Sequence, residues 1–290
     1  MNDKIIATHN GNFHADDVFS IAALKNIFPA FKLVRTRDLD LIARADIVID
    51  VGGEYDSNTD RFDHHQRGGA GERENGIPYS SFGLVWKKYG LQICQDNQDV
   101  ANALDAGLVS TIDAIDCGHV EGVSEGISLS QTISMFNPTW QEDSHFDRCF
   151  DEAVDFASRV LTRFIASANG GISAKKIVAK AIENAQDPRV IVLEKYTPWK
   201  RTVHALSEQA LYVVYPSQTG EWRIQTVPVE PGSFENRQSL PEQWAGLSGK
   251  DLQQASGIDD AMFCHNGLFI AGAKSFESTM KMASIALEDK

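Results

Sequence analysis

The stretch KIIATHNGNFHADD (residues 4–17) decides how this chain folds. Its first five residues, Lys4 to Thr8, form a short apolar run typical of a buried strand. Apolar residues then recur at helical spacing up to Phe28. Strands are expected again at residues 33–34 and 46–51, with a helical fragment between them. This alternation predicts an α/β fold with a doubly wound, mainly parallel sheet.

Polar side chains follow the predicted strands at the points where each strand ends. His9 comes directly after the first strand, His14 and Asp16 lie on the turn into the helix, and Asp50 ends a later apolar strand. The segment Asp63-His64-His65 follows another short strand. Ligands of such sheets bind beyond the carboxyl ends of the strands, imidazole binds borderline transition metals, and a carboxylate can bridge two ions. We therefore predict a site for two divalent metals; helix caps or solvated surface groups are the alternative.

Two aspartates close an amphipathic helix that is predicted at residues 100–116. Asp113 and Asp116 are three positions apart, so they are neighbours on the helix surface. They lie in the last turn, where negative charge opposes the helix dipole. A bound cation would remove that penalty, whereas two solvated acids are the simpler interpretation.

A second, smaller domain is expected where the pattern changes to short strands after a proline. Helices are predicted before it at residues 146–165 and 174–184, separated by a break at Asn169-Gly170-Gly171. We therefore divide the chain into a metal-binding domain with linking helices (residues 1–187) and an α+β domain (residues 188–290). The active site is expected in the cleft between them.

Two features of the second domain suit a bound anion. His265-Asn266-Gly267 is a glycine-containing turn, and Gly272-Ala273-Lys274-Ser275 opens the last predicted helix. Backbone N–H groups at a helix N-terminus, with a nearby lysine, can hold a phosphate. An arginine can bind phosphate through two hydrogen bonds, although a surface arginine and an ordinary N-cap serine fit the same pattern. Candidate substrate-binding residues are therefore His265, Gly267, Gly272 and Lys274, together with Arg237, for which a surface position is the simpler interpretation.

The composition limits the substrates and surroundings of the protein. The formal net charge is −13, whereas proteins that coat long nucleic acids are normally basic. We therefore expect a small phosphorylated substrate or a short RNA or oligonucleotide. Without a long apolar run or a secretory pattern, we expect a cytoplasmic protein with no membrane partner. A homo-oligomer is compatible with the sequence, and reduced thiols are expected at Cys94, Cys117, Cys149 and Cys264.

Several motifs resemble those of one known family. They are THNGNFHADD (residues 8–17), DVGGEYD (50–56), FDHHQ (62–66) and DAID (113–116), and further matches extend to residues 263–274. In these motifs the chain is similar to the Myg-type family, which is often labelled metal-dependent protein hydrolase and is a branch of the DHH phosphoesterase superfamily. The resemblance covers nearly the whole chain, with differences at Asp17, Cys117 and Ala271.

The resemblance implies a ligand set for two divalent ions in a DHH-type domain. His9 would bind the first metal, and His14 stands where relatives more often have an aspartate. Asp16 and His64 would bind the second metal, and Asp50 would bridge both. Mn²⁺ is the preferred ion, with Mg²⁺, Co²⁺ and Zn²⁺ as alternatives.

The resemblance also implies the remaining catalytic groups. Either Asp113 or Asp116 would supply a further metal ligand; Asp113 is preferred from its place after the apolar helix segment, and Asp116 stays open. His65 would face the leaving group or the reacting phosphate, and Lys274 would stabilise the phosphoryl charge. Catalysis would therefore depend on Asp50, His65 and Lys274.

The function implied by the resemblance is that of a two-metal phosphoesterase. Within this class it points to 3′-to-5′ exonuclease action on RNA or short oligonucleotides, for which Tyr79, Trp140 or Phe234 could stack a base. A small-molecule phosphatase or pyrophosphatase with the same metal centre is a second hypothesis. A non-catalytic scaffold that binds metal is a third.

Overall fold

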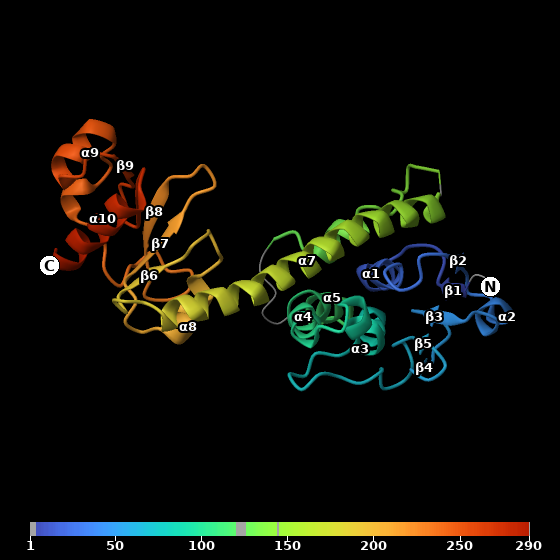
Figure 1. The fold of residues 1–290 in the computed structure, drawn as a ribbon. Helices are drawn as coiled ribbons and strands as arrows, with labels where there is room; N and C mark the ends of the chain where they lie inside the picture. Colours follow the sequence, from blue (N-terminus) through green and yellow to red (C-terminus); the bar gives the residue numbers. More distant parts are fainter. Residues whose placement is uncertain (1–3, 120–125, 144, 290) are drawn as a thin grey trace. The chain divides into compact units, whose positions relative to one another are not determined.

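The computed structural model describes residues 4–119, 126–143 and 145–289. The chain has a mixed α/β fold with two five-stranded mixed sheets, which confirms the predicted fold class at this level (Figure 1). It divides into two compact units, an N-terminal unit (Met1–Asn169) and a C-terminal unit (Gly170–Lys290).

The sheet of the N-terminal unit is mainly parallel. Its strands are β1 (Lys4–Thr8), β2 (Phe31–Arg35), β3 (Ile47–Ile49), β4 (Tyr55–Asp56) and β5 (Arg61–Phe62). They lie in the order β2-β1-β3-β5-β4, and all neighbours pair in parallel except β4 and β5. Because β1, β3 and β5 run in the same direction, their carboxyl ends lie at one edge of the sheet. Residues that follow these strands are therefore brought together.

Helices cover this sheet and supply further polar groups. They are α1 (Ala15–Leu24), α2 (Leu39–Ala43), α3 (Ser81–Ile93), α4 (Gln98–Leu104), α5 (Ser110–Asp116) and α6 (Leu129–Ser134). Every residue of α1 is buried, and α1 packs against α3 and α5. The single helix expected at residues 100–116 is instead α4 and α5 joined by a π-helical segment (Asp105–Val109). Asp105, the first residue of this segment, accepts a hydrogen bond of 2.8 Å from Arg73.

The sequence pattern also predicts that a helix capped by Ser80 or Ser81 ends at Gly90, but this glycine and the segment 169–171 both lie inside helices. Helix α3 continues past Gly90, because the absent side chain leaves room for Trp86: a Cβ at Gly90 would lie 2.8 Å from the Trp86 indole nitrogen. The break at residues 169–171 was also wrong, since α7 (Phe146–Glu183) is one continuous helix. Glycine costs a helix only about 1 kcal/mol, and the buried apolar residues Phe150 and Val178 of α7 offset this. The two compact units divide within α7, upstream of the boundary expected after residue 187.

The C-terminal unit is a sheet with a core on each face. Its strands are β6 (Val190–Val192), β7 (Tyr212–Pro216), β8 (Trp222–Thr226), β9 (Ala261–Cys264) and β10 (Ile270–Ala273), in the order β6-β7-β8-β10-β9; its remaining helices are α8 (Lys200–Leu206), α9 (Gly249–Ser256) and α10 (Phe276–Glu288). Along β7, Tyr212 and Val214 join one apolar cluster, whereas Val213 joins the other. This alternation shows that both faces of the sheet are covered.

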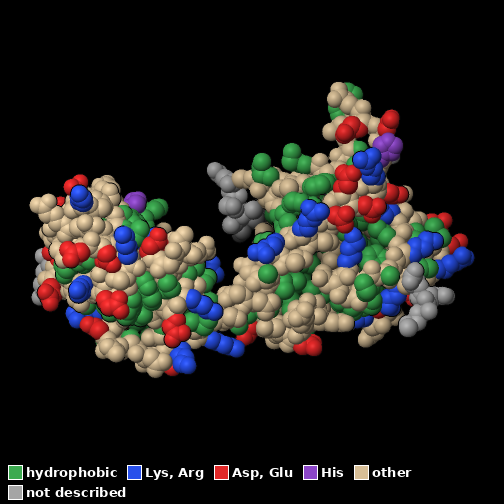
Figure 2. Space-filling view, turned by 45° about the horizontal axis from the view of Figure 1, so that its top comes forward, with side chains coloured by type: hydrophobic (Ala, Val, Ile, Leu, Met, Phe, Trp, Pro, Cys, Tyr) green, Lys and Arg blue, Asp and Glu red, His purple; other side chains and the backbone are tan. Residues whose placement is uncertain are grey.

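The surface mixes both signs of charge. Figure 2 shows acidic and basic side chains interspersed on the visible face, with apolar groups between them. All four cysteines are free thiols, as expected. Within the part of the chain that the structure describes, no helix is long and apolar enough to cross a lipid bilayer.

Candidate metal centre

The predicted ligands of the N-terminal unit converge at the carboxyl edge of its sheet. His9 follows β1, Asp50 follows β3, and the histidines at 64 and 65 follow β5. Asp16 comes from the first turn of α1, and Asp116 ends α5. Segments far apart in sequence therefore meet at one place.

Asp50 lies at the middle of this cluster. One carboxylate oxygen, Oδ2, is 3.2 Å from Nε2 of His9, and the other, Oδ1, is 3.3 Å from Nε2 of His64. Oδ1 also accepts a hydrogen bond of 3.0 Å from the hydroxyl of Ser81. The backbone of Asp50 has φ 55°, a left-handed conformation that costs free energy in a residue other than glycine. The fold thus maintains a strained backbone that aims this carboxylate between two imidazoles.

A second group of acids surrounds His64. Its Nε2 is 3.3 Å from Oδ2 of Asp116 and 3.8 Å from Oδ2 of Asp16. Among the described residues, Oδ1 of Asp16, Oδ2 of Asp17 and Nε2 of His64 are buried without a hydrogen-bond partner. Buried polar atoms normally have such partners. A bound cation would satisfy such unpaired atoms.

Asp113 lies outside the cluster. Its buried carboxylate is 2.7 Å from Nη1 of Arg73 and accepts a hydrogen bond of 3.0 Å from the backbone N–H of Gly83. Burial raises the pKa of Asp113 to about 6, although Ser80 and Arg73 favour its ionised form. The geometry therefore does not support the preference for Asp113 and brings Asp116 to the candidate centre.

His65 is held differently from its neighbour. Its Nδ1 is 2.8 Å from Oδ1 of Asp63, and its backbone N–H donates to the same oxygen at 3.0 Å. The other oxygen of Asp63 accepts a hydrogen bond of 2.6 Å from Gly53. The His65 side chain is 61% exposed, so Nε2 is the ring nitrogen available to a substrate. Side chains of adjacent residues in an extended segment are expected to diverge, but the two rings lie close together, with centroids 4.3 Å apart, and Nδ1 of His65 is also 3.4 Å from Oδ1 of Asp50.

The electrostatics of the cluster favour a cation. Burial opposes protonation of His9, but its close approach to the carboxylates of Asp17 and Asp50 outweighs this and raises the pKa of His9 to about 10. Burial likewise opposes protonation of His64, and Asp50 raises its pKa to about 10. Burial, together with the charge of Asp50, raises the pKa of Asp16 well above its usual range. Acids this close repel one another unless positive charge lies among them.

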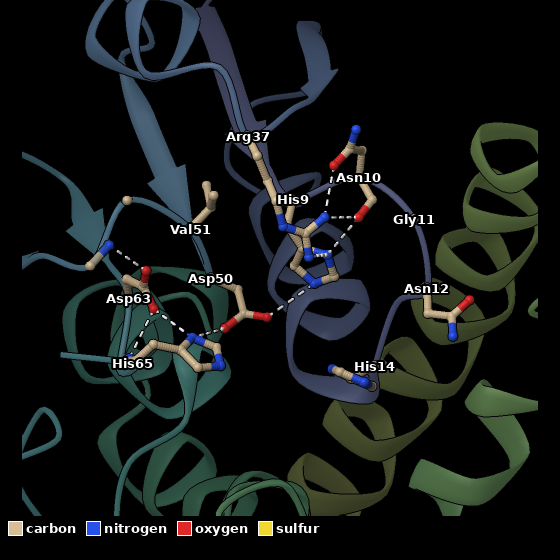
Figure 3. A pocket seen from close by; sticks show the side chains of 12 residues that line it. His9, Asn10, Gly11, Asn12, His14, Arg37, Asp50, Val51, Asp63 and His65 are labelled. Atoms are coloured by element: carbon tan, nitrogen blue, oxygen red, sulfur yellow. Dashed lines mark hydrogen bonds and ion pairs between the residues drawn. The ribbon is translucent and has the colours of Figure 1, made fainter. Parts of the chain in front are cut away.

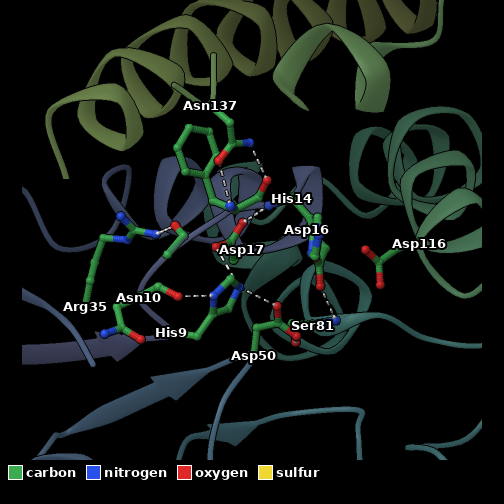
Figure 4. Close-up of polar contacts among 12 residues, drawn as sticks. His9, Asn10, His14, Asp16, Asp17, Arg35, Asp50, Ser81, Asp116 and Asn137 are labelled. Atoms are coloured by element: carbon green, nitrogen blue, oxygen red, sulfur yellow. Dashed lines mark hydrogen bonds and ion pairs between the residues drawn. The ribbon is translucent and has the colours of Figure 1, made fainter. Parts of the chain in front are cut away.

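The loop that carries His14 is fixed on both sides (Figure 4). Asn137 accepts a hydrogen bond of 3.0 Å from the backbone N–H of Phe13 and donates one of 2.9 Å to its carbonyl oxygen. Arg35 donates to the carbonyl oxygen of Gly11 at 2.7 Å. His14 itself is exposed, and its ring centroid lies 6.0 Å from that of His9. These hydrogen bonds therefore position the exposed imidazole of His14 beside the buried imidazole of His9.

A cavity of about 530 Å³ opens over the candidate centre. Figure 3 shows Asp50 between His65 and His9, with Arg37 next to His9. Among the residues that the structure describes, four overlapping groups could hold a metal ion, because the donor atoms within each group lie within 4.8 Å of one another: His9-His14-Asp50, Asp50-His64-His65, His64-Asp116-Cys117 and His14-Asp16-Asp116. Asp50 belongs to the first two. Mixed imidazole and carboxylate donors suit divalent transition metals, so the residues present fit the predicted metals.

Arg237 has a structural role in the C-terminal unit. Its Nη1 donates to three backbone carbonyl oxygens in the segment 207–210, at distances of 2.7 to 3.1 Å. These carbonyls follow the end of α8, where backbone acceptors lack partners within the helix. The arginine therefore secures this segment, and a nitrogen so engaged is not available to a phosphate.

The predicted anion cradle is partly accessible. His265, Gly267 and Lys274 are exposed, and the N–H of Gly267 donates to Nδ1 of His265 at 2.9 Å. Gly272 is explained by packing, because a Cβ there would lie 2.5 Å from Nη1 of Arg223 on the neighbouring strand. Lys274 and the turn at residues 265–267 are thus accessible to a ligand. Gly272 instead allows Arg223 of the neighbouring strand to pack closely against β10.

Four contributing residues were given no role from the sequence. Asp17 is fully buried and lies 3.2 Å from Nε2 of His9. Asp63 orients His65, Asn137 clamps the His14 loop, and Arg37 lines the cavity. The position of Asp63 directly before two histidines was a usable signal. Arg37 and Asn137 gave none, because only the folded chain brings them to the site.

The chain is similar to proteins from several eukaryotes. A family model described as an uncharacterised protein family (UPF0160) matches residues 5–287. A MYG1 protein of Saccharomyces cerevisiae is 32% identical over 326 residues, which cover 98% of this chain and 96% of the relative. A protein named MYG1 exonuclease from Homo sapiens is 33% identical over 325 residues, covering 98% of this chain and 86% of the relative. No solved structure matches the chain significantly.

Proposed function

Because this chain belongs to the uncharacterised protein family UPF0160, and because relatives named MYG1 exonuclease match nearly all of it, we propose that it is a nuclease-type hydrolase. More closely, we propose a phosphoesterase that requires two divalent metals and acts as a 3′-to-5′ exonuclease on RNA or short oligonucleotides. The net charge of −13 favours a short or single-stranded substrate. A cytoplasmic location and a homo-oligomer remain predictions.

One observation carries the proposal: the two oxygens of Asp50 face different histidines. The distances of 3.2 Å to His9 and 3.3 Å to His64 suit a carboxylate shared by two cation positions. The left-handed backbone of Asp50 supports a functional constraint, because strain of this kind clusters at active sites.

The proposed metal ligands form two sets, one for each metal ion, and both sets include Asp50. Divalent ions held there would neutralise charge on a phosphoryl group and activate a water molecule. Mn²⁺ is the ion we prefer, with Mg²⁺, Co²⁺ and Zn²⁺ as alternatives. The first set would be His9 and His14 with Asp50; the second would be Asp16, His64 and Asp116 with Asp50.

His65 is the proposed proton donor. The carboxylate of Asp63 lies 2.8 Å from Nδ1 of His65, which orients the ring. Its Nε2 would then donate a proton or hydrogen bond to the departing oxygen. The exposed Lys274 of the C-terminal unit is the residue we propose to stabilise the phosphoryl charge.

The substitution Asp50→Asn tests the function. It keeps a hydrogen-bond acceptor for Ser81 but removes the charge, so we expect loss of at least one bound metal and roughly 100-fold or greater loss of turnover. Metal content and hydrolysis of a labelled oligoribonucleotide are the measurements. Asp40→Asn, at an exposed acid of α2, is the matched control. Full activity with two bound ions in Asp50→Asn would refute the bridging role.

The substrate panel separates the alternatives. An oligoribonucleotide labelled at its 5′ end shows a ladder if residues leave from the 3′ end. Faster release of phosphate from pyrophosphate or a phosphate monoester would favour a small-molecule phosphatase. No turnover on any of these substrates, with metal bound, would favour the scaffold.

A further inference from the structure

Arg37 follows β2 and enters the cavity over the candidate centre (Figure 3). Among the described residues that line this cavity it is the only arginine or lysine, whereas Asp50 and Asp63 contribute acids. Arg35, two positions earlier, is ion-paired with Asp147 at 3.0 Å. Arg37 has no such carboxylate partner among the described residues; its polar contacts are with residues 9 and 10. A positive charge therefore stands at the cavity without a neutralising acid.

The guanidinium of Arg37 is nevertheless held in place. Its Nη1 donates to the side-chain oxygen of Asn10 at 2.7 Å and also to the backbone carbonyl of Asn10. A long side chain fixed in this way loses less conformational freedom when it binds a ligand. Arg37 is thus preorganised, which separates it from a freely moving surface arginine.

The second nitrogen of the guanidinium has no charged partner among the described residues. Nη2 of Arg37 lies 3.3 Å from Nδ1 of His9, and the same Nδ1 lies 3.2 Å from the carbonyl oxygen of Asn10. One ring nitrogen cannot serve both partners, and neither partner is an anion. Nη2 can therefore take an anionic acceptor, and the cavity is where one can bind.

From these observations we propose that Arg37 binds a phosphate oxygen of the substrate beside the metal centre. The inference rests on the phosphoesterase function proposed above and adds to it a protein group that contacts the substrate. Guanidinium groups pair with phosphate through parallel hydrogen bonds and stay charged at all physiological pH values. With Nη1 of Arg237 already bonded to backbone carbonyls, Arg37 is the arginine that serves this purpose.

Binding of adenosine 5′-monophosphate to the full-length, Mn²⁺-loaded protein tests this role. Calorimetry would compare wild type with Arg37→Gln, and we expect the dissociation constant to rise roughly 10- to 100-fold, the range for a hydrogen bond to a charged group. Arg37→Lys should recover part of the loss, because it restores the charge without the planar fork. The KM for a short oligoribonucleotide should rise in parallel.

Two controls separate a phosphate contact from damage to the site. Arg44→Gln, at an exposed arginine after α2, should bind the nucleotide as wild type does. Metal stoichiometry and unfolding temperature should be the same in Arg37→Gln and wild type. Wild-type affinity for the nucleotide in Arg37→Gln would overturn the role of Arg37 and leave the phosphoesterase intact. Absence of both nucleotide binding and turnover in the metal-loaded wild type would overturn both proposals.

Discussion

At the scale of single residues, the candidate centre places unusual charge inside the protein. The carboxylates of Asp16 and Asp17 are fully buried, and Asp50 is 4% exposed. Burying several acids together is costly unless cations or protons neutralise them. In the metal-free chain the protonated forms of His9 and His64 do this, which is why their pKa values are raised. A divalent metal would replace those protons.

Metal binding is therefore expected to release protons. The pKa of His9 and of His64 is raised from 6.5 to about 10, so both rings are protonated at pH 7.5, and ligation requires their neutral form. We expect at least about two protons, one from each histidine, to be released when both metal positions fill. Calorimetric titrations with Mn²⁺ in buffers of different ionisation enthalpy measure this number.

The raised pKa values of the two histidines also determine how fold stability and metal affinity change with pH. A histidine with a raised pKa stabilises the metal-free fold fully below about pH 6.5 and loses this contribution as the pH rises through 10. Metal affinity changes in the opposite sense and should increase by about tenfold per pH unit for each proton released. An affinity that is flat between pH 6.5 and 8.5 would show that the histidines are not the ligands.

At the scale of elements, helices α3 and α5 pack closely at Gly83, a residue without a side chain. A Cβ at Gly83 of α3 would lie 2.0 Å from Oδ2 of Asp113 on α5 and 2.8 Å from the ring of Tyr79. The Asp113 carboxylate cannot move aside freely, because Arg73 holds it at 2.7 Å. Gly83 is thus the position at which helix propensity and packing oppose each other.

A pair of glycine substitutions tests this balance. Gly83→Ala should lower the free energy of unfolding by about 1–3 kcal/mol, the usual cost of overpacking. Gly170→Ala should raise it by about 0.5–1 kcal/mol, because Gly170 is an exposed position within α7 and a Cβ there meets nothing within 4 Å. Denaturant unfolding of both variants gives the comparison; equal effects of the same sign would contradict it.

At the scale of the whole molecule, the two units have different candidate chemistry. Every candidate metal ligand belongs to the N-terminal unit, whereas Lys274 and the turn at residues 265–267 belong to the C-terminal unit. Each unit has its own buried core. Bound metal and a bound anion are therefore expected to stabilise different compact units of the chain.

Hydrogen exchange of the intact protein can locate the effect of the metal. Saturating Mn²⁺ stabilises the folded form by about 2.7 kcal/mol at 100 times its dissociation constant. We expect the added protection in β1, β3 and α1, which carry or precede the ligands, and not in β7 and β8. Equal protection of both sheets, or protection of the C-terminal sheet alone, would contradict this assignment.

Much of the fold follows from local patterns. The strand at 4–8, the helix at 39–43 and, to within one residue, the strand expected at 190–193 agree with the structure, because apolar periodicity depends on neighbouring residues. Glycine was the main source of error. Gly90 and Gly170 look like helix stops, but contacts with residues outside the local pattern decide whether a glycine ends a helix or allows close packing.

By itself, the sequence determined that His9, Asp50 and His64 stand at the ends of strands, since strand ends are local features and parallel strands end at a common edge. Only the tertiary structure decided that Asp116 joins these groups while Asp113 turns to Arg73. Both acids lie on the same helical turn, so their roles depend on what packs against each side of α5. That packing involves residues distant in the chain, and no local pattern encodes it.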